Sequence, residues 1–209
     1  MSAAAASVTM RRALAPEDAA RANFYALLGR LLRSAPDAEL IAALAASDPL
    51  PADGDVAIAA AWRNLVGASS AMDAEAAAAE YEALFNGVGK AEVSIYAGFY
   101  SGAPSIHHPR VRLQADLAAL GLARREVVNE PEDHFAGLFE TMRVLVAGGA
   151  GREPATIAEQ KRFFDAYLQP SGLKFMKALG ASPKANYYRT VAALGAAFVS
   201  LESDSFQLA

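Results

Sequence analysis

Cysteine is absent from this chain of 209 residues, which also contains only three histidines and one tryptophan. Without cysteine the protein has no disulfides, no thiolate metal ligands and no cysteine nucleophile. β-Branched residues are few, whereas alanine, the strongest helix former, contributes 50 residues. The composition therefore argues against an all-β fold and favours a helical one.

Long apolar runs and basic stripes are also missing. No segment approaches the roughly 20 apolar residues of a membrane-spanning helix, and the net charge is −4 with both signs mixed along the chain. The Arg11-Arg12 pair is followed by Pro16, Glu17 and Asp18, where an export signal needs an apolar stretch. We therefore expect a cytoplasmic protein that binds no nucleic acid and does not insert stably into a membrane.

The fold class that we expect is all-α, a single globular bundle of about nine to ten helices. Apolar residues at helical spacing, with proline and glycine as stop signals, place helices at about 16–33, 37–46, 55–66, 73–85, a segment ending at Gly121, 131–147, 154–168, 171–179 and 183–200. No strand pattern and no repeat of 20 to 50 residues is found.

Amino-acid composition and helical pattern divide the chain into four parts. Residues 1–15 are expected to be disordered, and 16–86 form an N-terminal helical part. Residues 87–108 are rich in glycine and poor in charge, and a segment of this length is typical of a functional loop or a joint. Residues 109–209 form a C-terminal helical part, which together with the first makes one domain.

A polar group opens the predicted helix at 131. Pro131 takes its first position, and Glu130, Glu132 and Asp133 favour the positive end of the helix dipole. The simplest interpretation of these polar residues is therefore that they begin a helix. His134 does not fit this interpretation, because a histidine beside three acids in a first turn opposes the helix dipole unless the side chain has a functional role. Glu130 and His134 also have the spacing of a metal pair, although a metal site needs three or more protein ligands.

Other chemistry-bearing patterns are sparse. The chain has no nucleophile elbow, phosphate-binding loop or dinucleotide fingerprint. His107 and His108 are adjacent, so they point in different directions and are more typical of an exposed loop than of one metal site. We expect no enzyme, no catalytic residue, no metal and no cofactor. An apolar stripe at i, i+3 and i+4 on the fourth helix is more typical of a core than of a binding site: Tyr81, Leu84, Phe85.

Four segments, in order, resemble the TorD/DmsD family of redox-enzyme maturation chaperones. Residues 80–87 resemble its E-Y-x-x-L-F-x-G segment, and 94–96 its S-V-Y/W. Residues 129–135 match its E-P-x-D-H signature, and 160–170 resemble its Q-x-x-F-F-x-x-H-L-x-P-W. The resemblance covers most of the chain. It departs at Ser171, where the family has tryptophan, and in the loop after Phe85, which is shorter and lacks proline.

The resemblance implies an all-helical cytoplasmic chaperone without catalytic activity. Such a chaperone binds the apo form of a molybdopterin oxidoreductase catalytic subunit, often through its twin-arginine signal peptide. It holds this client until the cofactor is inserted, before export or assembly. A monomer and a dimer with exchanged halves are both compatible with the family. The residues that match the family's signal-peptide site are Tyr81, Leu84, Phe85, Tyr96, Glu130, Asp133 and His134.

The physical chemistry agrees with this assignment. A twin-arginine signal offers two cations followed by an apolar stretch, so its receptor should place acids beside an apolar groove. Glu130, Glu132 and Asp133 can meet the arginines through charge-assisted hydrogen bonds. Tyr96 and Phe99 belong to the apolar part, together with the stripe on the fourth helix.

Two other functions remain open from the sequence. One is a helical metal-dependent hydrolase that uses Glu130 and His134 with His107 and His108, and it predicts stoichiometric bound metal. The other is a helical adaptor that docks on a folded partner. An adaptor binds the mature partner as well as the cofactor-free one, whereas a chaperone prefers the cofactor-free form.

Overall fold

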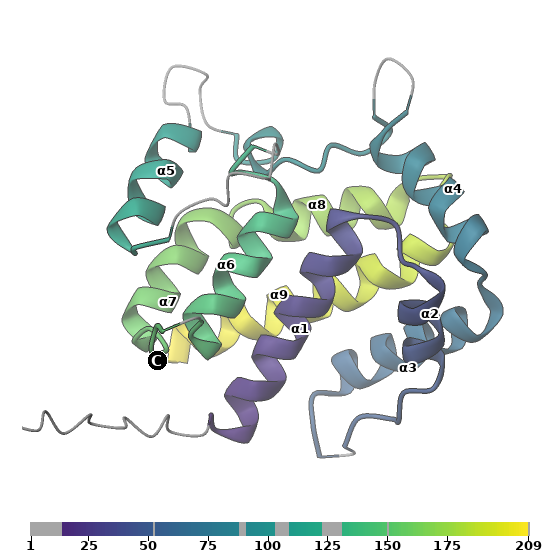
Figure 1. The fold of residues 1–209 in the computed structure, drawn as a ribbon, viewed down its shortest axis with the longest axis horizontal. Coiled ribbons are helices and arrows are strands. Elements are labelled where there is room, and N and C mark those ends of the chain that lie inside the picture. The colour runs from purple at the N-terminus through teal and green to yellow at the C-terminus, as the bar shows by residue number, and fades with distance from the viewer. Residues whose placement is uncertain are drawn as a thin grey trace, which may run out of the picture.

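A computed structural model describes residues 14–51, 53–87, 91–102, 109–122, 131–149 and 151–208, and within these ranges it contains nine α-helices and no strand. This confirms the predicted all-α fold (Figure 1). The helices are α1 (Pro16–Arg33), α2 (Ala38–Ala45), α3 (Val56–Ala71), α4 (Ala74–Phe85), α5 (Pro109–Ala119), α6 (Phe135–Ala147), α7 (Ile157–Phe163), α8 (Gly172–Ala181) and α9 (Tyr187–Leu208).

Aspartate caps explain where three of these helices begin. The side chains of Asp37, Asp55 and Asp73 each accept a hydrogen bond from the backbone N–H three residues later, at 2.7–2.8 Å. An acidic N-cap satisfies an N–H group that has no partner inside the helix and complements the helix dipole. The predicted starts at these aspartates were therefore correct to within one residue.

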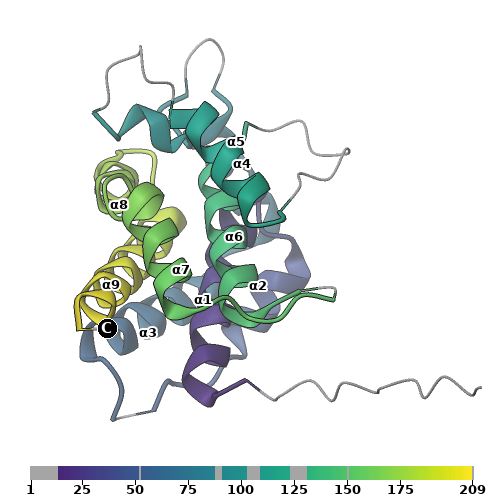
Figure 2. The ribbon, with the colours of Figure 1, turned by 90° about the vertical axis from the view of Figure 1, so that its left-hand side faces the viewer.

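The core lies between two pairs of helices. α1 packs along α6, and α8 packs along α9, so that the two pairs form adjoining layers (Figure 2). The two helices run close together at Gly29, where a Cβ would lie 3.5 Å from the Ala136 carbonyl oxygen, at van der Waals contact. Between the layers the Tyr25 ring packs edge-on against Phe198, with ring centroids 4.7 Å apart, and in a tilted arrangement against Phe139, with centroids 6.1 Å apart. These aromatic contacts join the first, sixth and ninth helices into one core.

A buried ion pair also joins α1 to α9. Glu202, only 2 % exposed, accepts hydrogen bonds from Arg21 at 2.7 and 2.9 Å and from the Tyr25 hydroxyl at 2.6 Å. Burial and the nearby Glu202 carboxylate raise the pKa of the Tyr25 phenol well above its usual value. The carboxylate is therefore compensated by one cation and one hydroxyl donor, as a buried charge requires.

The final helix differs from its predicted bounds of 183–200. It begins at Tyr187 and continues to Leu208. The start moves because Glu80 of α4 accepts hydrogen bonds from the backbone N–H groups of Asn186, Tyr187 and Tyr188, at 2.8, 3.0 and 2.8 Å. This cap comes from another helix, so local sequence does not reveal it.

The segment predicted as one helix over 154–168 is divided. α7 ends at Phe163, and a π-helical turn, η2 (Phe164–Leu168), follows it. Residues 1–13, 88–90 and 103–108 lie outside the described ranges, and these include nearly all of the segment predicted to be disordered and part of the predicted joint. The four-part division stays a prediction. Among the residues that are described, no helix combines the length and apolar character needed to span a bilayer.

Candidate functional site

Two segments far apart in the sequence lie side by side at the start of α6. The Ala97 N–H donates to the Asp133 carbonyl oxygen at 2.8 Å, and the Phe135 N–H donates to the Ile95 carbonyl oxygen at 3.0 Å. Tyr96 and His134 thus form an isolated antiparallel bridge. Their rings meet edge-on, with centroids 5.6 Å apart. The pairing brings together three of the residues predicted for the client site, Tyr96, Asp133 and His134.

His134 is the N-cap of α6, and this corrects the predicted helix start. α6 begins at Phe135, not at Pro131, and the His134 Nδ1 accepts a hydrogen bond from the Ala136 N–H at 3.1 Å. A ring nitrogen that accepts carries no proton, so a neutral His134 holds its proton on Nε2. The ring is 5 % exposed. The histidine that opposed the dipole in a first turn is therefore used as the N-cap.

Asp133 and Glu132 direct their carboxylates toward the loop at 97–99 and toward α5. Asp133 is 7 % exposed, and its Oδ2 accepts from the Gly98 N–H at 3.3 Å. A Cβ at residue 98 would lie 3.0 Å from that oxygen, so the close approach favours glycine. Glu132 Oε1 accepts from the Gln114 side chain at 2.9 Å. The Arg110 guanidinium lies 3.6 Å from Asp133 Oδ1 and 3.9 Å from Glu132 Oε2.

The segment that contacts Asp133 through the Ala97 and Gly98 N–H groups also carries aromatic rings. Tyr96 is 38 % exposed and Phe99, in the short 3₁₀ turn η1 (Ala97–Phe99), is 70 % exposed. The neighbouring Tyr100 is turned inward, where its ring contacts Phe135 and Phe175 and its hydroxyl donates to the Ser94 carbonyl oxygen at 2.8 Å. Burial raises the pKa of this phenol to about 12. Because Tyr100 anchors the loop, the loop presents Tyr96 and Phe99 outward.

We call Tyr96, Phe99, Glu132 and Asp133 the ring–carboxylate surface. It combines two exposed aromatic rings with two carboxylates, which is the chemistry expected for an arginine followed by apolar residues. Phe99 and Glu132 were secondary in the sequence prediction. Arg110 and Gln114 on α5 were not predicted, although they share a helix face with Leu113 at i, i+3 and i+4.

The other predicted stripe, on α4, lies in the core. Tyr81, Leu84 and Phe85 are 7 %, 0 % and 7 % exposed. The Tyr81 hydroxyl donates to the last carbonyl oxygens of α1, at 3.0 and 3.2 Å, and the Phe85 ring packs against Tyr188 at 5.5 Å. The Leu84 carbonyl oxygen accepts from the Val93 N–H at 3.0 Å. In this structure the stripe supports the loop that carries Tyr96 and offers no exposed surface of its own.

Three of the four residues of the hydrolase alternative, Glu130, His107 and His108, lie outside the described ranges. Glu130 was also predicted for the client site, and its part in that site stays a prediction. Among the described residues no cluster of three or more histidine, aspartate and glutamate side chains has the arrangement of a metal site. The only member that the structure places, His134, uses its Nδ1 as a helix cap.

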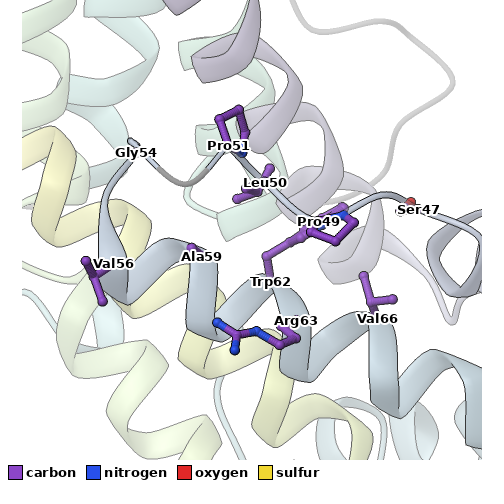
Figure 3. Close-up of a pocket in the computed structure, with 10 residues that line it drawn as sticks. All are labelled: Ser47, Pro49, Leu50, Pro51, Gly54, Val56, Ala59, Trp62, Arg63 and Val66. Carbon is purple, nitrogen blue, oxygen red and sulfur yellow. The ribbon is translucent and has the colours of Figure 1, made fainter.

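A second concave region lies on another part of the molecule. A groove of about 500 Å³ runs between α3 and the connection that precedes it (Figure 3). The Trp62 indole crosses it and donates to the Asp48 carbonyl oxygen at 2.9 Å. Most other lining residues are apolar or small: Pro49, Leu50, Pro51, Gly54, Val56, Ala59, Val66. None of the predicted site residues lines this groove.

Residues 52–177 match the family model described as nitrate reductase delta subunit. The match includes the whole segment from α3 through the ring–carboxylate surface to the middle of α8. No curated protein matches the chain.

Proposed function

The chain belongs to the nitrate reductase delta subunit family, and from this premise we propose how it recognises its client. The family indicates a chaperone for the maturation of a molybdoenzyme. Our proposal is that the protein acts in the cytoplasm on the cofactor-free oxidoreductase. It binds the twin-arginine signal peptide of that client at the ring–carboxylate surface and holds the client until the cofactor is inserted.

The observation that carries the proposal is the pairing of residues 95–97 with 133–135. It gathers two exposed rings and two carboxylates from distant parts of the chain. Glu132 and Asp133 provide oxygens for a guanidinium group, and such charge-assisted bonds are roughly twice as strong as neutral ones. Tyr96 and Phe99 provide apolar area beside these oxygens. Binding and holding require no nucleophile and no proton transfer, so no residue needs a catalytic role.

Within this proposal we assign contact with the client according to the position of each predicted residue. Tyr96 is exposed, and Asp133, although only 7 % exposed, adjoins it through the backbone pairing, whereas Tyr81, Leu84 and Phe85 lie in the core beneath the loop. His134 fixes the first turn of α6 through its cap and so holds Asp133 in place. Direct contact of a client with the α4 stripe would need this core to open.

The test is calorimetric titration with a peptide that carries two adjacent arginines followed by an apolar stretch. Asp133→Asn keeps the shape of the side chain and removes its charge. Hydrogen bonds to charged groups contribute about 1.5–3 kcal/mol, so we expect affinity to fall by at least about tenfold. Glu140→Gln is the matched control, because Glu140 lies on α6 and pairs with Arg143 at 2.7 Å.

A peptide with lysines in place of both arginines should bind more weakly, because an ammonium group lacks the planar fork that matches carboxylates. Equal affinity of the wild type and Asp133→Asn for the arginine peptide would refute the proposed site. Stoichiometric metal in the purified protein would favour the hydrolase instead.

A further inference from the structure

The cation position of the ring–carboxylate surface already has an occupant from this chain. The guanidinium of Arg110 lies near both carboxylates, with its Nε 3.6 Å from Asp133 Oδ1 and one terminal nitrogen 3.9 Å from Glu132 Oε2. The two carboxylate side chains are only 13 % and 10 % exposed, whereas Arg110 is 47 % exposed. An arginine thus approaches two enclosed acids from the solvent side, as a client arginine would.

This contact is loose, and the same chain shows what a tight one looks like. Arg21 holds Glu202 through nitrogen–oxygen distances of 2.7 and 2.9 Å, within the range of about 2.7–2.9 Å typical of charge-assisted bonds. The Arg110 distances are about 1 Å longer. Half-exposed pairs of this kind change an equilibrium constant by about fivefold or less. Another arginine can therefore displace Arg110 at small cost.

The helix that carries Arg110 is also held by few contacts. Among residues 110–120 only Leu113 is buried, whereas α6 buries seven residues. Its side-chain contacts are a hydrogen bond from Gln114 to Glu132 and one from the Tyr167 hydroxyl to Asp116, and the Leu120 carbonyl oxygen beyond its end accepts from Arg152. α5 lies at the periphery of the bundle (Figure 1). Segments with few buried contacts open at low free-energy cost, so the Arg110 end can move away from the acids.

We infer that Arg110 is an internal substitute for the client's arginine and competes with it for Glu132 and Asp133. The inference rests on the proposed function and adds two things to it. It identifies the chemistry of the cation position as guanidinium, and it makes α5 a regulator of that position. Arg110 leaves Tyr96 and Phe99 exposed, so a client gains an apolar contact that the internal arginine does not make. Binding then selects segments that carry arginine and apolar residues together.

Population arithmetic gives the expected size of the effect. If the acids are free of Arg110 for a fraction f of the time, the apparent Kd for the client equals the intrinsic value divided by f. Removing Arg110 sets f to one. The ion pair of Arg110 changes the equilibrium between the occupied and the free acids by about fivefold or less. Arg110→Gln should therefore lower the Kd for the peptide by about two- to fivefold.

The experiment titrates the arginine peptide described above into the full-length protein and its variants. Arg112→Gln is the matched control, because it removes the same charge from the same helix, and among the described residues the ion pair of Arg112 is with Asp116, at 3.8 Å. Hydrogen exchange at the amides of residues 113–119 is measured in parallel. We expect tighter binding for Arg110→Gln and unchanged binding for Arg112→Gln. Peptide should speed exchange in wild-type α5, whereas Arg110→Gln should exchange faster even without peptide.

Each other outcome overturns the inference. If Arg110→Gln binds as the wild type does while Asp133→Asn loses affinity, the proposed site stands and the competition does not exist. If Arg110→Gln binds more weakly, Arg110 belongs to the receiving surface. If none of the proteins binds the peptide, the proposed function fails and the inference fails with it. Arg110→Lys keeps the charge without the guanidinium fork, and its affinity should lie between those of the wild type and Arg110→Gln.

Discussion

The cap that Glu80 places on α9 yields the sharpest prediction about stability. Its two carboxylate oxygens accept three backbone N–H groups at the start of that helix, at 2.8, 2.8 and 3.0 Å. Glu80→Gln keeps the size of the side chain but replaces one accepting oxygen by an NH₂ group. That NH₂ group is a donor facing donors, so at least one N–H loses its partner.

The cost follows from two contributions. Hydrogen bonds to a charged group contribute about 1.5–3 kcal/mol, and the lost attraction between a carboxylate and a helix N-terminus costs about 0.3–1 kcal/mol. Together they predict a loss of about 2–4 kcal/mol in the free energy of unfolding. For a chain of this size the melting temperature should fall by about 5–10 °C.

The assay is urea unfolding at pH 7 followed by circular dichroism. Glu82→Gln is the control, because Glu82 is exposed on the same helix and, among the described residues, its side chain accepts a hydrogen bond from the Asn86 side chain at 3.1 Å and none from α9. Peptide affinity at 15 °C should be unchanged in Glu80→Gln, since the contacts of Glu80 are with α9. Equal stability of Glu80→Gln and Glu82→Gln would refute the role of Glu80 as the cap of α9. A loss of peptide affinity in Glu80→Gln without a loss of stability would refute it as well.

Three further predictions concern the core. Tyr81→Phe should lower the free energy of unfolding by about 1 kcal/mol, because the hydroxyl bonds to the end of α1 are lost; no change in urea unfolding would contradict it. Glu202→Gln should cost about 3–5 kcal/mol, because it leaves Arg21 without its buried carboxylate, and a melting curve like that of the wild type would exclude this. Burial raises the pKa of the phenols of Tyr25 and Tyr100 above 10 in the folded state. The stability they contribute is therefore complete below pH 10 and is lost as the pH rises above it, since the phenols of the unfolded chain ionise first. Ultraviolet absorbance of the phenolate should show that these tyrosines ionise together with unfolding. Their ionisation near pH 10 in the folded protein would contradict this prediction.

The helices were largely predictable because their signals are local. Asp37, Asp55 and Asp73 were each expected at a helix start, and each caps a helix. A cap acts within three residues, so the sequence around it is sufficient. The α9 start failed for the opposite reason, since its cap is supplied by Glu80, more than 100 residues earlier in the chain.

The site was predictable only in part. The sequence places Asp133 and His134 next to each other, but it does not show that their backbone pairs with the segment around Tyr96. That pairing moves the helix start from Pro131 to Phe135 and makes His134 a cap. The stripe of Tyr81 and its neighbours has the spacing of an apolar face, and spacing alone does not say whether that face meets the core or a client.

The central claim is that this protein holds a cofactor-free molybdoenzyme through the ring–carboxylate surface. The most direct measurement compares its affinity for the cofactor-free and the mature form of the oxidoreductase that copurifies with it from the native cell. We predict that the wild type binds the cofactor-free form at least about tenfold more tightly, and that Asp133→Asn loses this preference while Glu140→Gln retains it. Equal affinity for both forms would contradict the chaperone and favour an adaptor, and an unchanged preference in Asp133→Asn would place the client elsewhere.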